Sequence, residues 1–325
     1  RLHQQLPSLL PAPAKQAQLA LQASSVPEQF GDFAPAEPAL QQRWPAGERA
    51  AAERLQLFCN QLIDDYAEDR NRPDLDATSR LSPYLVAGVL SPRQCLHAAL
   101  QANGGEFDTG SSGAVSWINE LLWREFYKHI LVCYPHVSRH RAFKPETENV
   151  AWRDDPHGLA AWKEGRTGIP LVDAAMRQLL ATGWMHNRLR MVSAMFLTKN
   201  LLIDWREGER WFMQHLIDGD LAANNGGWQW SASTGTDAAP YFRVFNPVSQ
   251  SEKFDADGKF IRKYCPELTK LSNKYIHNPT ECPPFELQMA GVVLGETYPR
   301  PVVEHDVARK KTLERYAVVK KAKED

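Results

Sequence analysis

Apolar residues recur every three or four positions along much of this chain, a spacing that predicts amphipathic helices. The clearest case begins at Glu48, after which Leu55, Phe58, Leu62 and Tyr66 fall on one helical face. Comparable patterns predict further helices over residues 114–134, 171–182, 187–203, 207–217 and 301–325. Sustained alternation of apolar and polar residues, which would indicate strands, is absent from the sequence, as is any internal repeat. The sequence therefore predicts an all-α fold.

Two serine–proline pairs mark the starts of two more predicted helices, at Ser82-Pro83 and at Ser91-Pro92. Proline suits the first helical position, and a serine hydroxyl before it can accept a hydrogen bond from a free backbone N–H group. Gln94 completes a capping box with Ser91. Both serines are therefore expected to cap short helices.

The chain of 325 residues is long enough for one large domain or two ordinary ones. Residues 1–47 are rich in Ala, Pro, Gln and Leu without a sustained period, so we interpret them as an inter-domain linker with one short helix at most. Residues 48–325 form the predicted helical domain. Within it, 135–170 is expected to be loop-rich, and 218–245 is polar and rich in glycine with no helix assigned.

Composition narrows the class of protein. Apolar residues make up 43% and charged residues 24%, which is typical of a soluble globular protein, and neither a membrane span nor a signal peptide is visible. Five widely spaced cysteines without a CxxC pair disfavour a disulfide framework and indicate a reducing cytoplasm. With a net charge of −1, a nucleic-acid-binding protein would need a local basic patch. The ten tryptophans suit core packing, or base stacking and electron transfer.

Several common motifs are missing. The sequence has no GxGxxG, no P-loop and no GxSxG. His136 and His140 are four residues apart, but the segment lacks the glutamate of a zinc protease motif. Asp218 and Asp220 are not followed by the remaining ligands of a calcium loop. We therefore expect no metal site.

Four segments carry more specific chemistry, and the first is 77–94. The hydroxyls of Thr78, Ser79 and Ser82 stand at a helix start beside one arginine, an arrangement suited to a diphosphate. An ordinary helix cap would have the same sequence, so this segment alone decides nothing.

The second segment, 117–129, places Glu120, Trp123 and Tyr127 on one helical face. An acid, an indole and a phenol there indicate a polar cavity, and the alternative is a helix–helix interface with one buried salt bridge. The third segment, 183–212, carries polar residues at helical spacing. The fourth, starting at Asp218, gathers two Asp, two Asn and two Trp within 13 residues.

The blocks TSRLSPYL, WREF, GWMHNRLRM and DGDLAANNGGWQWSASTGTDAAPYFR occur in this order. They are similar to the defining blocks of the C-terminal FAD domain of the cryptochrome/photolyase family, and closest to the microbial class I cyclobutane pyrimidine dimer photolyases. The resemblance is strong over about residues 48–270. It implies light-driven repair of DNA: excited, reduced FAD donates an electron to a flipped-out dimer, the cyclobutane ring splits and the electron returns.

The resemblance also implies which residues hold FAD. The diphosphate and its neighbouring groups would contact Tyr66, Thr78, Ser79, Arg80, Leu81 and Ser82. The isoalloxazine or the adenosine end would be surrounded by Trp117, Glu120, Arg190, Asp218 and Asp220, with Arg190 and Asp218 paired beside the flavin ring. Asn224 matches the position that faces the flavin N5, where plant cryptochromes typically have Asp and insect ones Cys.

Three tryptophans match the family's electron-transfer chain from the flavin to the surface: Trp228, Trp205 and Trp152. Their alternative role is packing. Because they lie in separate segments, their alignment rests on the resemblance and not on spacing.

Further matches concern the substrate. Trp123 and Trp230 match the aromatic walls of the dimer pocket, and Glu120 would hydrogen-bond the pyrimidine edge. Asn187 and Met191 match the same pocket, and since (6-4) photolyases carry histidines at both positions, that substrate is disfavoured. The DNA-contacting rim is matched by Arg70, Arg124, Arg188, Arg243 and Gln250, for which a solvated charged face is the alternative.

The resemblance is incomplete at the N-terminus. The family's N-terminal α/β domain of roughly 150 residues has no counterpart here, so the sequence is either truncated or one piece of a longer protein. That domain holds most of the antenna site. Ser138-Arg139 stands where folate-binding relatives often have Cys-Lys, so a folate antenna is disfavoured and the antenna chromophore stays unknown.

Two rival functions stay open. One is a cryptochrome-like photoreceptor without repair activity, which Asn224, Trp123 and Trp230 disfavour. The other is a helical fragment unable to hold FAD by itself. The favoured interpretation is a monomeric bacterial enzyme, cytoplasmic and associated with the nucleoid through its DNA substrate.

Overall fold

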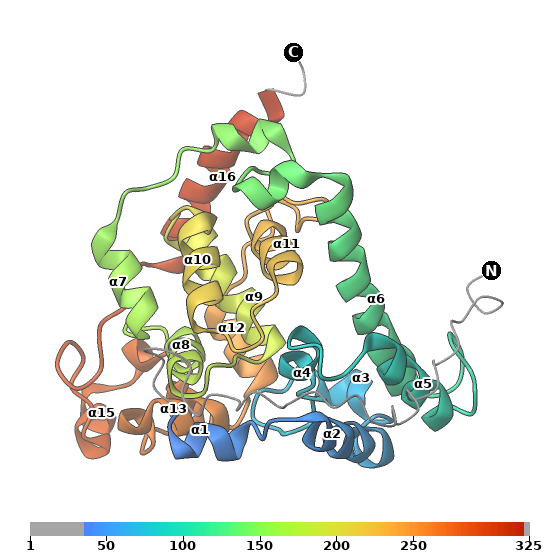
Figure 1. Cartoon of the computed structure of the whole chain (residues 1–325). Helices are drawn as coiled ribbons and strands as arrows, with labels where there is room; N and C mark the ends of the chain where they lie inside the picture. Colours follow the sequence, from blue (N-terminus) through green and yellow to red (C-terminus); the bar gives the residue numbers. More distant parts are fainter. Residues whose placement is uncertain (1–35, 322–325) are drawn as a thin grey trace, which may run out of the picture.

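The structure is a computed structural model that describes residues 36–321 (Figure 1). In this part of the chain every regular element is a helix, and an isolated bridge between Leu294 and Tyr298 is the only strand-like pairing. The all-α prediction is therefore confirmed. Of the predicted linker, residues 1–35 lie outside the described residues, and the remainder contains α1 (Pro38–Arg43).

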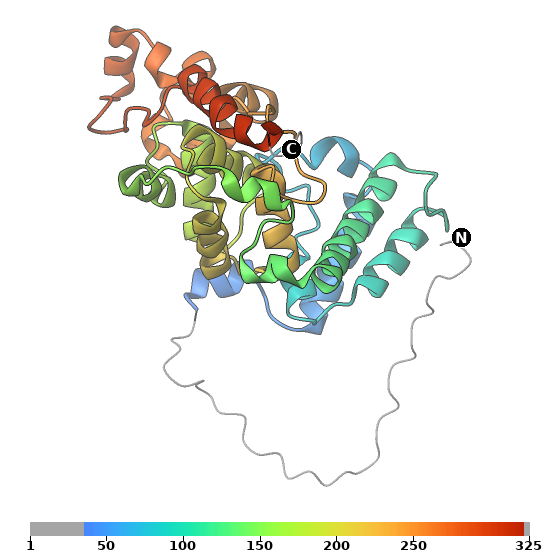
Figure 2. The same cartoon turned by 90° about the horizontal axis from the view of Figure 1, so that it is seen from above.

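The helices form two groups, which Figures 1 and 2 show as neighbours that meet where α6 runs beside α11. The first group is α2 (Glu48–Gln61), α3 (Tyr66–Asp69), α4 (Ser82–Val86), α5 (Pro92–Ala102) and α6 (Ser112–Cys133). The second is α7 (Pro156–Glu164), α8 (Pro170–Thr182), α9 (Asn187–Met195), α10 (Trp205–His215), α11 (Leu221–Ser231), α12 (Pro247–Phe254), α13 (Lys259–Tyr264), α14 (Asn273–Ile276), α15 (Pro284–Ala290) and α16 (His305–Lys321). Short 3₁₀ turns include η2 (Pro135–Arg139) and η3 (Pro145–Asn149), and η4 (Phe196–Asn200) is a π turn.

Each group has its own hydrophobic core. In the first, Phe58 packs against Trp117 with ring centroids 4.8 Å apart. In the second, Trp162, Phe212 and Trp228 pack together, with 5.0 Å between the last two rings. The border between two separately packed groups is a favourable place for a ligand, because side chains from both can line it without disturbing either core.

The two predicted serine caps have different outcomes. Ser91 accepts from the backbone N–H of Gln94 at 3.3 Å, and the Gln94 side chain accepts from the Ser91 N–H at 2.8 Å, so the capping box is confirmed. Ser82 was wrongly predicted as a cap: it is the first residue of α4, Leu81 takes the cap position, and no side chain caps this helix. Arg80 has φ +52° and turns the chain sharply, and Leu81 is buried in the first core.

Helix α11 was missed by sequence analysis, because Asn224, Asn225, Gly226 and Gly227 all have low helix propensity. Packing outweighs that preference. A side chain on Gly226 would overlap the Tyr127 ring of α6, so glycine is what lets the two helices approach closely.

The other predicted helices fit with small shifts at their ends: α6, α8, α10 and α16 correspond to 114–134, 171–182, 207–217 and 301–325. The predicted helix over 187–203 is interrupted, because α9 ends at Met195 and continues as the π turn η4. The loop-rich region 135–170 contains the unpredicted α7.

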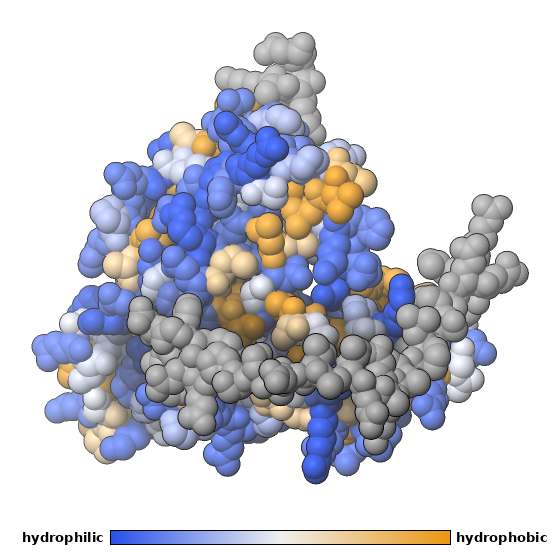
Figure 3. Space-filling view, viewed as in Figure 1, coloured by the Kyte–Doolittle hydropathy of each residue, from blue (hydrophilic) through white to orange (hydrophobic). Residues whose placement is uncertain are grey.

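Apolar side chains are also exposed near the α10–α11 connection. Met213, Ile217 and Leu221 are each more than a third exposed. On the face of the molecule seen in Figure 1, Figure 3 shows apolar surface in the middle, flanked by hydrophilic surface. Such a surface is suited to packing against a further segment or partner.

Candidate functional site

A cavity of about 140 Å³ lies between α9 and α11. Seven residues singled out from the sequence line it: Asn187, Arg190, Met191, Asp218, Asp220, Asn224 and Trp228. The start of α9 supplies the first three, and the turn before α11 and that helix supply the others. Residues from two separate sequence segments thus converge on one space.

An ion pair forms one wall of this cavity. Arg190 Nη2 donates to both carboxylate oxygens of Asp218, at 3.0 and 2.7 Å, and Arg190 Nε donates to the Met185 carbonyl at 2.8 Å. The predicted pairing of these two side chains is therefore present. Asp218 is buried, and a buried carboxylate with a two-contact arginine partner is held in a defined orientation.

Asn224 is fixed by the neighbouring helix. Its Nδ2 donates to the backbone carbonyl of Glu209 in α10, at 3.0 Å. This bond orients the amide and leaves its oxygen to accept from a ligand. Asp220 has a local role, since its side chain accepts from the Ala223 N–H at 3.0 Å and caps α11.

The Thr78–Ser82 segment lies outside this cavity, and Arg54 of α2 holds its backbone. Arg54 Nε donates to the Ser79 carbonyl at 2.8 Å, and its Nη2 donates to the Thr78 carbonyl at 2.7 Å. Sequence analysis missed Arg54. No motif distinguishes it from the other arginines of an amphipathic helix.

Three of the residues matched to FAD contacts are core residues. Tyr66, Leu81 and Trp117 are all buried in the first core, where Tyr66 packs edge-on against Phe58. Burial raises the pKa of the Tyr66 phenol above its ordinary value, and Glu120 adds to this effect. None of the three lines either of the two larger cavities, so their place in the structure is the first core.

A second cavity, of about 110 Å³, is lined by Thr78, Arg80, Trp184 and His186 among others. The guanidinium of Arg80 lies over the Trp184 ring at 5.6 Å. His186 is buried, its Nδ1 accepts from the Arg188 N–H at 3.2 Å, and its Nε2 has no hydrogen-bond partner. A neutral ring that accepts at Nδ1 carries its proton at Nε2, so a buried donor is left for a ligand acceptor.

Sequence analysis did not single out His186 as a site residue. Its burial makes the free energy of unfolding depend on pH. Burial, reinforced by Arg188, lowers the pKa of His186 from 6.5 to about 3. Between these values the unfolded chain binds a proton that the folded chain does not, so the free energy of unfolding decreases as pH falls. Relative to His186→Gln, the unsubstituted protein should lose about 2 kcal/mol more between pH 7 and 5 in urea denaturation. Equal losses would contradict this.

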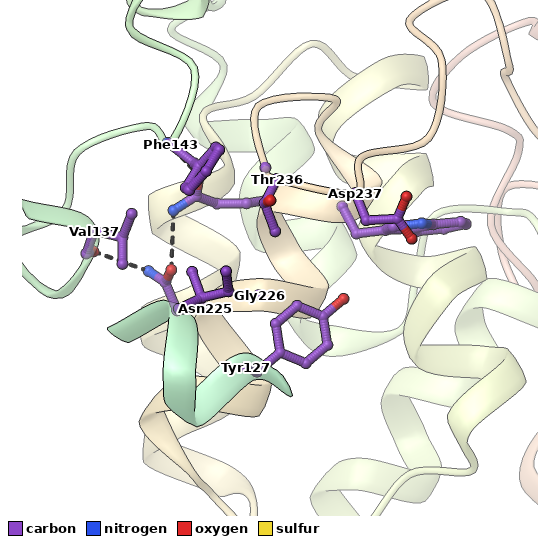
Figure 4. A pocket seen from close by; sticks show the side chains of 11 residues that line it. Tyr127, Val137, Phe143, Asn225, Gly226, Thr236 and Asp237 are labelled. Carbon is purple, nitrogen blue, oxygen red and sulfur yellow. Dashed lines mark hydrogen bonds between the residues drawn. The ribbon is translucent and has the colours of Figure 1, made fainter. Parts of the chain in front are cut away.

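The predicted aromatic walls lie near α6 and α11. Trp123 is 42% exposed, and its ring centroid is 6.2 Å from that of Tyr127. Half-buried Trp230 and Tyr127 line the same small cavity beside Gly226, in which Asp237 also lies (Figure 4). Tyr127 therefore lies next to Trp123 and shares a cavity with Trp230, a position that sequence analysis did not assign to it. Burial raises the pKa of Tyr127 to about 12, so it stays a neutral phenol.

The four arginines of the predicted rim differ in how they are held. Arg70 pairs with Glu120 at 2.5 Å. Arg188 donates to Asn71 Oδ1 at 2.6 and 3.2 Å, and burial together with Arg70 lowers its pKa. Arg124 donates to the Leu85 carbonyl and to Glu125 Oε1, both at 3.3 Å. Arg243 is exposed.

Gln250, the remaining rim residue, lies in α12 with a buried Oε1 that has no hydrogen-bond partner.

The three tryptophans of the predicted electron chain pack with different neighbours. Trp228 is buried against Phe212, and its ring is 5.9 Å from Trp162. Trp205 is buried under the guanidinium of Arg206, at 4.8 Å. Trp152 is half-buried, edge-on to Tyr316 at 6.2 Å. Trp228 and Trp205 are thus both buried, and Trp152 alone of the three reaches the surface.

Two further features concern residues 36–321 as a whole. This part of the chain contains no group of three or more His, Cys, Asp or Glu side chains that could hold a metal ion. None of its helices combines the length and the apolar character needed to cross a membrane.

The site combines the Arg190–Asp218 ion pair, the oriented amide of Asn224 and the unpartnered buried donor of His186. These groups fit a large cofactor with many acceptor atoms. Residues 117–318 match the family model described as the FAD binding domain of DNA photolyase, and the chain belongs to this family. FAD is accordingly its cofactor.

Curated relatives agree with this family. The chain is 52% identical over 327 residues to the deoxyribodipyrimidine photo-lyase of Salmonella typhimurium and 50% identical over 328 residues to that of Escherichia coli. Both alignments cover 99% of this chain but only 66% of the relative. The chain therefore spans a little less than two thirds of these proteins.

Solved structures of the same fold include both photolyases and cryptochromes. A class III photolyase from Agrobacterium tumefaciens matches with a TM-score of 0.82 and 45% identity, over 88% of this chain and 60% of that one. A Synechocystis cryptochrome matches with a TM-score of 0.77 and 37% identity, over 83% and 56% of the two chains.

Arg54 provides a test of the FAD site. Arg54→Met removes both bonds to the Thr78 and Ser79 carbonyls, and FAD affinity is expected to fall about tenfold, the effect of roughly 1.4 kcal/mol. Flavin release during dilution, followed by fluorescence, measures it. Arg49→Met is the matched control, because Arg49 lies on the same helix and pairs with Glu53 in solvent. Equal retention of FAD in both variants would exclude this role for Arg54.

Proposed function

We propose that this chain is the catalytic flavin domain of a photolyase that repairs cyclobutane pyrimidine dimers in DNA under light. The observation that carries the proposal is the α9–α11 cavity. Its Arg190–Asp218 pair and Asn224 provide polar contacts for a flavin, while Asn187 and Met191 line the same space. The relatives named deoxyribodipyrimidine photo-lyase support the same activity.

FAD fits the polar atoms that line the two cavities. Arg190, Asp218 and Asn224 would contact its ring system, and Thr78 and the Nε2–H of His186 would bind its polar groups, with Ser79 next to Thr78 in the chain. When bound and excited in its reduced form, FAD supplies the electron that opens the cyclobutane ring and takes it back. The protein orients the cofactor and excludes water from it.

The substrate would be a dimer flipped out of the duplex. Flipping costs a few kcal/mol, and stacking on Trp123 and Trp230 would return roughly 1–3 kcal/mol per base. Glu120 would accept hydrogen bonds from the pyrimidine edge, held in place by its ion pair with Arg70. Asn187 and Met191 would complete the pocket with an amide and an apolar side chain.

The DNA backbone would be bound by the basic rim. Exposed Arg243 is free of protein carboxylates among the described residues and is suited to a phosphate. Arg188, already held by Asn71, would present a fixed guanidinium. A local rim of this kind allows a chain of net charge −1 to bind DNA.

The tryptophans would restore the active flavin. Trp152→Phe is expected to slow light-driven reduction of oxidised FAD at least tenfold, because phenylalanine is far harder to oxidise than the half-exposed indole at the chain's outer end. Repair by enzyme reduced chemically beforehand should be unchanged. The two rates are measured on the same preparation, and a loss of repair by pre-reduced Trp152→Phe would refute this separation of roles.

Binding in the dark tests the proposal against a photoreceptor. The FAD-loaded protein should bind an oligonucleotide with one thymine dimer at least a hundredfold more tightly than the undamaged strand. The difference arises because a damaged site is easier to flip. Equal affinities with FAD bound would favour a cryptochrome-like receptor.

A further inference from the structure

A lysine is buried in the middle of the second core. Lys199 lies in the π turn η4, whose five residues are all buried, and its side chain is among the largest that are fully buried. No carboxylate of the described residues lies within ion-pair distance of its Nζ. Burying an ammonium costs free energy unless hydrogen-bond partners compensate for the lost water. The groups that bind Lys199 Nζ therefore have a structural or functional role.

The partners of Lys199 are backbone carbonyls in one loop. Nζ donates to the Arg243 carbonyl at 2.9 Å and to the Pro240 carbonyl at 3.3 Å. Four residues earlier, Met195 Sδ accepts from the Phe245 N–H at 3.3 Å. The end of α9 and its π turn thus hold three backbone groups of the loop Pro240–Phe245.

The π turn has a part in this contact. A π turn inserts one extra residue into a helix and is common at functional sites. Here it also bonds the C-terminal helix, because the Thr312 hydroxyl donates to the Lys199 carbonyl. Burial and nearby Arg243 lower the pKa of Lys199 to about 7, a sign of how strongly this ammonium has been removed from water.

The outer face of the same loop carries exposed side chains. Phe242 is 59% exposed and Arg243 is exposed, while Tyr241 stacks on Tyr316 of α16 at 6.3 Å. The Arg243 N–H donates to the Pro240 carbonyl at 2.9 Å, closing a turn around Phe242. The loop therefore has a fixed inner side and presents an arginine and an aromatic ring to solvent.

We propose that Lys199 is a positioning residue that clamps the loop Pro240–Phe245 so that Arg243 meets the DNA backbone in a fixed geometry. This rests on the proposed function, since it assumes that Arg243 binds DNA. Two carbonyls of one turn accept from one ammonium, so loss of the ammonium removes both bonds that tie this turn to the second core. Arg243 would then have to be ordered at the moment of binding, which weakens affinity without changing any contact with the flavin.

The experiment compares Lys199→Met with Thr198→Val. Methionine keeps the length and volume of the side chain without its donors. Thr198 is buried in the same π turn and donates only to the Ala194 carbonyl of its own helix, so its variant controls for general damage there. Three quantities are measured for each: flavin content, the Kd for dimer-containing DNA, and hydrogen exchange at the Arg243 and Phe245 amides.

Lys199→Met should raise the Kd about tenfold and speed exchange at both amides at least tenfold, while flavin content and the repair rate at saturating substrate stay within twofold. Thr198→Val should leave the Kd and both amides unchanged. Unchanged exchange in Lys199→Met, or equal losses of affinity in the two variants, would overturn the proposal. If Lys199→Met does not fold, Lys199→Gln replaces it with the same expectations, since its shorter side chain cannot reach both carbonyls.

Failure of the proposed function would be seen separately. An unsubstituted protein that binds FAD but not dimer DNA would refute repair, yet the exchange rates would still decide whether Lys199 holds the loop.

Discussion

Asp218→Asn is expected to lower the free energy of unfolding by about 3 kcal/mol and to abolish retention of FAD during purification. Asparagine preserves the shape of the side chain, but it cannot balance the charge of Arg190, which donates to both carboxylate oxygens. Asp218 is buried and the Arg190 side chain is only 26% exposed, so water can replace the lost charge only in part. Urea denaturation and the flavin-to-protein absorbance ratio measure the two effects.

Asp204→Asn is the matched control for this change. Asp204 also pairs with an arginine, Arg206, at 3.1 Å, and caps α10 by accepting from the Arg206 N–H. That pair is partly solvated, and asparagine caps helices as well as aspartate does, so the loss should stay below about 1 kcal/mol. If the two variants were equally stable and both held FAD, the Arg190–Asp218 pair would have no special part in the site.

Trp230→Ala is expected to raise the Kd for dimer-containing DNA by about 10- to 100-fold, the loss of roughly 1–3 kcal/mol of stacking on one base. FAD should stay bound, because Trp230 lines the small cavity with Tyr127 and does not line either of the two larger cavities. Titration with a fluorescent oligonucleotide measures the Kd, and flavin absorbance measures the occupancy.

The control for Trp230 is an aromatic residue elsewhere on the surface. Phe285 of α15 is 70% exposed, and Phe285→Ala should bind the same DNA as tightly as the unsubstituted protein. An unchanged Kd in Trp230→Ala would remove Trp230 from the pocket. Loss of FAD from that variant would instead mean that the ring supports the cofactor.

Helices with strong apolar periodicity were predictable, and those set by packing were not. Helix α2 follows from its apolar positions as far as Phe58, but the helix ends at Gln61, so the prediction was wrong for Tyr66, which begins α3. The capping box at Ser91 follows from residue types alone. Helix α11 contains two glycines whose purpose is visible only beside Tyr127 of α6. Ser82 failed as a cap because the left-handed turn at Arg80 and the burial of Leu81 shift the start of α4, and neither has a local signal.

The site was predicted unevenly for the same reason. Family blocks led to most of the candidate residues, and the structure gathers seven of them around one cavity. Arg54 and Lys199 bind backbone carbonyls, which any sequence supplies, and His186 is distinguished only by a buried ring nitrogen without a hydrogen-bond partner. The roles of these three side chains can be recognised only when their distances to neighbouring atoms are known.

The central claim is repair of pyrimidine dimers by the flavin domain. The most direct measurement mixes chemically reduced, FAD-loaded protein with oligothymidylate that carries cyclobutane dimers, applies blue light and follows thymine absorbance. Recovery of absorbance that requires both light and protein is the predicted result. If the protein holds FAD and is saturated with dimer-containing DNA, and thymine absorbance still does not recover, the account is contradicted.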